Sequence, residues 1–76
     1  MPDLPVMRPR QLLKHLKAFG CELVSIEGSH HKIHYAETNL TTVLAIHSGK
    51  DITKRTFAST LKQLGIDVDE FLDFIK

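Results

Sequence analysis

The segment CELVSIEGSHHKIHYA, residues 21–36, decides the fold of this chain of 76 residues. Its first half is rich in residues that favour β-strands, and Gly28-Ser29 then supplies a turn. The alternating residues after the turn predict a second strand from His30 to Ala36. Because side chains alternate between the faces of a strand, His31 and Ile33 are expected to face the core while His30 points outward.

A third strand is predicted from Thr41 to His47, where β-branched residues are frequent. The turn before it contains Asn39, a residue type that tolerates the left-handed conformation. Centring this hairpin between Thr38 and Asn39 places apolar residues opposite each other, and a slip of one residue would move them to the wrong face. The expected cross-strand partners are Ile33 with Leu44, His31 with Ile46, and His30 with His47.

Three helices are predicted, one before the strands in the sequence and two after them. The first starts at Pro9 and ends at Gly20, the second follows a cap at Asp51 or Thr53 and ends at Gly65, and a short third helix has Asp67 at its N-terminus. The apolar positions expected to pack in the core are Leu12, Leu16 and Phe19, then Phe57, Leu61 and Leu64, then Val68, Phe71, Leu72 and Ile75. The order predicts an α+β fold, α-β-β-β-α, with a three-stranded antiparallel sheet and a short C-terminal helix.

The length and composition fit one small domain over residues 1–76, with its core at about residues 8–72. A chain this short has little room for a deep pocket, so we expect no organic cofactor. The apolar runs are too short to cross a membrane and the N-terminus has no signal-peptide pattern, which predicts a cytoplasmic protein. The single cysteine, Cys21, is expected to be a buried free thiol.

The charge is unevenly distributed along the chain. The net charge is +1, but residues 1–66 hold nine of the ten Lys/Arg and five of the nine Asp/Glu, which leaves +4 before an acidic C-terminal segment. On the first helix, Arg10, Lys14 and Lys17 share the face opposite the apolar stripe. A basic surface of this kind fits a polyanionic partner, and it equally fits an ordinary solvated helix face.

The five histidines do not predict a metal site. His30 and His34 would lie about 13 Å apart on one strand face, too far to share an ion, and two histidines alone make a poor zinc site. An exposed histidine can instead serve as a general acid or base near neutral pH. With RNA, His30 could remove the proton of a 2′-hydroxyl while Lys32 offsets charge on the phosphate. A solvated histidine without a catalytic role is the alternative.

Residues 8–72 resemble the HicA toxins, small mRNA interferases of toxin–antitoxin pairs. The residues that carry the resemblance are Gly20-Cys21-Glu22-Leu23-Val24, Gly28-Ser29-His30-His31, Ile46-His47, Leu61-Lys62-Gln63-Leu64-Gly65-Ile66 and Asp69-Glu70-Phe71. The resemblance implies a fold like the double-stranded-RNA-binding domain and a metal-independent endoribonuclease that cleaves mRNA. It also implies that His30 is the catalytic residue and that a HicB antitoxin covers the site.

The other candidate site residues are expected to bind the substrate: Ser29, Lys32, His47, Arg10, Lys14, Lys17, Lys54 and Arg55. A competing hypothesis is a non-catalytic RNA-binding module, in which the basic side chains contact phosphates and His30 is only a polar neighbour. A third is a protein-interaction domain whose basic face binds an acidic partner.

Overall fold

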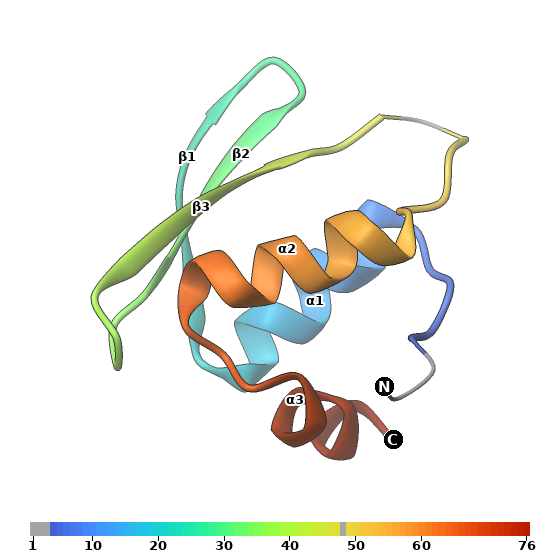
Figure 1. Cartoon of the computed structure of the whole chain (residues 1–76). Helices are drawn as coiled ribbons and strands as arrows, with labels where there is room; N and C mark the ends of the chain where they lie inside the picture. Colours follow the sequence, from blue (N-terminus) through green and yellow to red (C-terminus); the bar gives the residue numbers. More distant parts are fainter. Residues whose placement is uncertain (1–3, 48) are drawn as a thin grey trace.

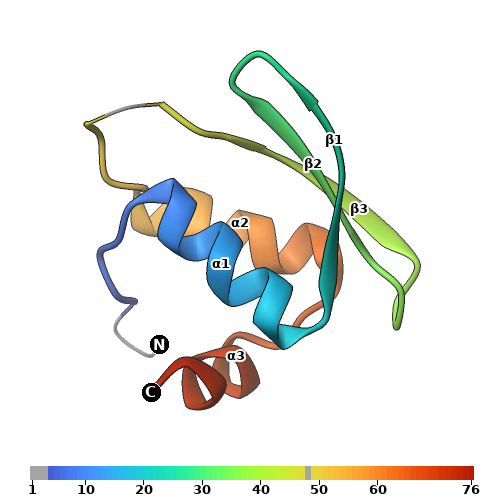
Figure 2. The ribbon, with the colours of Figure 1, turned by 180° about the vertical axis from the view of Figure 1, so that it is seen from behind.

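A computed structural model describes residues 4–47 and 49–76. In chain order the elements are α1 (Pro9–Phe19), β1 (Cys21–Glu27), β2 (His30–Tyr35), β3 (Leu40–Ala45), α2 (Lys54–Leu64) and α3 (Val68–Ile75). The strands form one antiparallel sheet in the order β1-β2-β3. Helices α1 and α2 lie side by side against one face of this sheet, and α3 packs against both of them (Figures 1 and 2). The predicted α+β arrangement is therefore confirmed.

The helix boundaries follow the capping signals in the sequence. Pro9 opens α1, and Gly20 ends it with a φ of 127°. The Thr53 side chain caps α2 by accepting a hydrogen bond of 3.1 Å from the Thr56 N–H, so Thr53 rather than Asp51 is the cap. Asp67 caps α3 by the same type of contact with the Glu70 N–H. Each cap satisfies a backbone donor that the first helical turn leaves without an intrahelical partner.

The core fills the space between the sheet and the helices. Its fully buried side chains come from every layer and are Phe57, Phe71, Leu12, Leu16, Ile33, Leu44, Leu61 and Leu64. The ring of Phe71 on α3 meets Phe57 on α2 at a centroid separation of 5.9 Å and Phe19 on α1 at 5.2 Å. These edge-to-face contacts attach the last helix to the other two. In the described part of the chain, no helix is long and apolar enough to span a membrane.

The predicted register between β2 and β3 is wrong by two residues. Ile33 pairs with Thr42 rather than Leu44, and His31 pairs with Leu44. His30 pairs with Ala45, so the expected pairing with His47 does not occur, and β3 ends before His47. The predicted faces survive this error, because a shift of two residues returns each side chain to the same side of the strand.

The turn between β2 and β3 explains the register. Tyr35 pairs with Leu40, which leaves four residues, Ala36 to Asn39, in the loop. Asn39 has a φ of 57°, as expected for a left-handed turn residue. The Thr38 hydroxyl donates a hydrogen bond of 2.6 Å to the carbonyl of Leu64 at the end of α2. The turn is therefore held in place by a contact with α2 that the local sequence does not reveal.

Candidate nucleic-acid interface

His30 stands at the start of β2, immediately after the tight turn formed by Gly28 and Ser29. Gly28 has a φ of 58°, a conformation that glycine adopts without steric cost. The turn brings Glu27 directly opposite His30 as the last cross-strand pair of β1 and β2. The His30 side chain is exposed, as predicted. The site is therefore a histidine at the end of a hairpin, with a carboxylate residue as its neighbour on β1.

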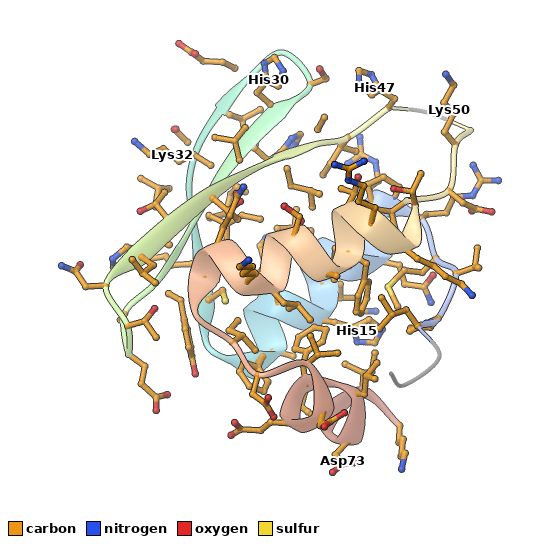
Figure 3. The ribbon with its side chains drawn as sticks, in the orientation of Figure 1. His15, His30, Lys32, His47, Lys50 and Asp73 are labelled. Atoms are coloured by element: carbon orange, nitrogen blue, oxygen red, sulfur yellow. The ribbon has the colours of Figure 1, made fainter. Side chains whose placement is uncertain are left out.

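His30 and Lys32 share the outer face of the sheet. No helix of the described chain covers this face, since all three lie on its other side (Figures 1 and 2). Figure 3 shows both side chains directed away from the helices, with His30 near the end of the hairpin and Lys32 farther along β2. On β3 their partners are Ala45 and Val43, which carry no charge. The face is open and offers an imidazole and an ammonium group to a ligand.

His31 has the opposite orientation, as predicted from the alternation. Its side chain is only 7% exposed. The ring Nδ1 lies 3.1 Å from the carbonyl oxygen of Ser29. The Ile46 N–H donates to the same oxygen at 2.8 Å. The turn that carries His30 is therefore bonded both to its own strand and to the chain that continues from β3.

Comparison with known families identifies the kind of protein to which this surface belongs. Residues 9–66 match the family model described as the HicA toxin of bacterial toxin–antitoxin systems. The chain belongs to the HicA toxin family. A comparison of the sequence with curated proteins found no match. Membership of a toxin–antitoxin family implies an antitoxin as the partner of this chain.

In this HicA-family chain, His47 lies apart from His30. Figure 3 places His47 on the segment after β3, next to Lys50 and not beside the imidazole of His30. It lines a shallow hollow of about 270 Å³ together with Arg8 and Arg10. A second hollow, of about 200 Å³, joins His47 to Lys50 and to Thr53 at the start of α2. His47 therefore borders two hollows that also include basic side chains.

The predicted cationic residues divide between different parts of the HicA-family chain. Lys32 lies on the outer face of the sheet, whereas Arg10, Lys14 and Lys17 are exposed along α1 in the helical layer. Lys54 and Arg55 are exposed in the first turn of α2. Arg8 forms an ion pair of 3.1 Å with Asp51. The structure does not gather these cations around His30, and their contact with a substrate stays a prediction.

The remaining histidines have local roles. The His34 Nε2 lies 2.9 Å from the Asn39 side-chain oxygen, so this residue fastens the turn after β2. His15 is half-buried beside α3. Within residues 4–47 and 49–76, no three His, Cys, Asp or Glu side chains are grouped as metal ligands.

Glu27 and Ala45, the cross-strand neighbours of His30, were not predicted. A two-residue turn at Gly28-Ser29 would have indicated the first of them.

Two inward-facing residues outside this surface, Cys21 and Tyr35, have raised pKa values. Burial raises the pKa of the Cys21 thiol to about 11, which disfavours the reactive thiolate. The hydrogen bond to Glu37, followed by burial, raises the pKa of Tyr35 to about 12. That bond is 2.7 Å long, with the phenol donating to the carboxylate. Cys21 and Tyr35 thus stabilise the fold in their protonated forms.

Proposed function

We propose that this HicA-family chain is a metal-independent endoribonuclease that cleaves mRNA with His30 as its catalytic residue. The observation that carries the proposal is the placement of His30, which is exposed on an uncovered sheet face beside Lys32. Membership of the HicA toxin family supports the same activity. The reaction takes place in the cytoplasm, where mRNA is available.

The chemistry requires few groups from the protein. His30 accepts the proton of a ribose 2′-hydroxyl, and the 2′-oxygen forms a bond to the adjacent phosphorus. The bond from phosphorus to the 5′-oxygen then breaks, that oxygen takes up a proton from water, and His30 releases its own proton to the solvent. The products are a 2′,3′-cyclic phosphate and a 5′-hydroxyl. Lys32 stabilises the negative charge that develops on the phosphate oxygens. The 2′-hydroxyl supplies the nucleophile, so no metal-bound water is needed.

Substrate contacts are proposed for the flanking polar residues. Ser29 adjoins His30 in the turn and can donate a hydrogen bond from its hydroxyl. The other proposed contact residues are exposed or border the hollows described above, and they are His47, Arg10, Lys14, Lys17, Lys54 and Arg55. Contacts to phosphate hold RNA without selecting its sequence, and they weaken as salt is added.

A HicB-type antitoxin is the proposed inhibitor. The outer face around His30 is exposed, and its β3 residues Val43 and Ala45 are uncharged. A protein that covers this face would exclude RNA from His30 without any change in the fold. Inhibition by occlusion therefore needs no second conformation of the toxin.

Growth arrest on induced expression tests the proposal. Wild type should arrest growth and deplete mRNA, and His30→Ala should do neither while accumulating as folded protein. His34→Ala is the matched control, because His34 lies on the same strand and its hydrogen bond is to the turn residue Asn39. Coexpression of the HicB-like protein encoded beside the toxin should restore growth. Growth arrest by His30→Ala would contradict the assignment, and RNA binding without cleavage by wild type would favour a non-catalytic module.

A further inference from the structure

We infer that His31 is a positioning residue that holds His30 in place for catalysis through the carbonyl group of Ser29. This inference rests on the proposed function, because it assigns a role around the same reaction. His31 does not touch the substrate. Its ring lies on the inner face of the sheet, whereas His30 is on the outer face.

The Ser29 carbonyl is the link between the two histidines. It accepts hydrogen bonds from the His31 Nδ1 at 3.1 Å and from the Ile46 N–H at 2.8 Å. This carbonyl belongs to the peptide unit that also contains the backbone nitrogen of His30. A peptide unit is planar, so hydrogen bonds that fix its oxygen also fix the orientation of the plane that contains the His30 nitrogen. The two bonds therefore limit rotation of the backbone at the catalytic residue.

The direction of the hydrogen bond determines the tautomer of His31. A carbonyl oxygen can only accept, so the His31 Nδ1 must carry a proton. In the neutral ring the proton is therefore on Nδ1, and Nε2 has none. This assignment provides a spectroscopic signature of the contact that does not depend on activity.

Packing alone would favour an apolar residue at position 31. The inward neighbours on the sheet include Ile33 on the same strand and Leu44 directly opposite. A buried polar ring lowers stability unless it is hydrogen-bonded, whereas leucine at this site would need no partner. What histidine adds is a donor aimed at the Ser29 carbonyl. The contact supports the turn rather than the bulk of the core.

Two substitutions separate positioning from packing. His31→Leu keeps an apolar side chain in the core but removes the donor. His31→Asn is smaller, yet its amide can donate near the position of Nδ1. Because small displacements of a catalytic group can slow a reaction by about 100-fold, we expect His31→Leu to lower kcat by about 10-fold to 100-fold with little change in KM. His31→Asn should recover most of the lost kcat even if it is the less stable variant.

The matched control is His34→Leu, which removes a histidine from the same strand without touching the Ser29 carbonyl. It should leave kcat within about twofold of wild type, since its hydrogen bond lies at the other end of β2. Long-range proton–nitrogen NMR spectra of wild type should show His31 as the Nδ1–H tautomer. The ring signals of His30 should shift in His31→Leu and return toward wild type in His31→Asn.

The outcomes distinguish this inference from the proposed function. If His30→Ala is inactive but His31→Leu, shown to be folded by circular dichroism, has the kcat of wild type, His31 has no positioning role. Equal losses in His31→Leu and His31→Asn would also overturn the inference, as would an Nε2–H tautomer of His31. If His30→Ala cleaves RNA as fast as wild type, the proposed function itself fails.

Discussion

His30 faces Ala45 across the β2–β3 ladder, and both residues are exposed, with only a methyl group as the side chain opposite the imidazole. Directly opposed side chains on a sheet lie within about 5.5 Å at their Cβ atoms. A larger or charged residue at position 45 would therefore act on whatever binds at His30. Ala45 on β3 and Glu27 on β1, rather than His47, are the direct cross-strand neighbours of the proposed catalytic group.

Ala45→Glu should slow RNA cleavage by about 10-fold or more, because a second carboxylate beside His30, in addition to Glu27 on β1, increases the repulsion of the phosphate that approaches it. The control is Thr41→Glu, which adds the same charge to the same exposed face of β3 but lies opposite His34. Single-turnover rates at saturating RNA measure the difference. Equal effects of the two substitutions would show that total charge, and not proximity to His30, controls the rate.

His47→Ala should affect binding rather than chemistry, since His47 lies with Arg8 and Arg10 and away from the hairpin end. One exposed phosphate contact contributes up to about 1 kcal/mol, so KM should rise by about threefold to fivefold while kcat is retained. Steady-state kinetics at two salt concentrations provide the measurement. A loss of kcat as large as that in His30→Ala would place His47 in the catalytic step.

Gly65→Ala tests the contact that fixes the β2–β3 turn. Gly65 has a φ of 71°, and a Cβ atom there would lie 3.0 Å from side-chain atoms of both Thr38 and Leu40. We expect a loss of about 2 kcal/mol in the free energy of unfolding, from the left-handed backbone and from the displaced turn together. Gly49→Ala is the control, because its φ of 78° is similar but no atom lies within 4 Å of the added Cβ. Urea unfolding should show the greater loss of unfolding free energy for Gly65→Ala. Equal losses in the two variants would mean that the turn moves aside at no cost in stability.

The raised pKa of Tyr35 predicts that the folded protein loses stability at alkaline pH. Its folded-state pKa of about 12 exceeds the usual value of 10.0, so the protonated phenol is favoured in the folded state. The stabilisation is fully present below pH 10 and is lost as the pH rises toward 12. Cys21, with a pKa raised from 9.0 to about 11, acts in an overlapping range. In a Cys21→Ala background, Tyr35→Phe should therefore flatten the decline of unfolding free energy above pH 10, and an unchanged slope would contradict this account.

The local sequence was sufficient for the faces of the strands and for most helix limits, although it left the cap of α2 open between Asp51 and Thr53. Thr53, Asp67 and Gly65 are capping residues whose preferences act within one turn of a helix. The opposite orientations of His30 and His31 follow from the two-residue period of a strand. These features depend on neighbouring residues only, and they could be predicted.

The register of β3 depends on residues far away in the sequence. Thr38 bonds to Leu64, and Thr42 donates a hydrogen bond to the Gln63 side chain, so α2 determines where the hairpin turns. Both the predicted and the observed register bury one face of β3, so hydrophobic alternation cannot choose between them. The error moved His47 beside His30 in the prediction. It did not affect the assignment of His30, which rests mainly on the resemblance to the HicA toxins and on the outward orientation of His30 after the first hairpin.

His30 is proposed to catalyse the attack of a ribose 2′-oxygen on the adjacent phosphorus. The most direct test is the single-turnover cleavage of a short synthetic RNA in the presence of a chelator, by wild type and by His30→Ala. We predict that wild type forms a 2′,3′-cyclic phosphate end, that His30→Ala forms none, and that RNA with 2′-deoxyribose at the cleaved position is not cut by wild type. Cleavage by His30→Ala at the wild-type rate, or cutting of the 2′-deoxy position, would contradict the account.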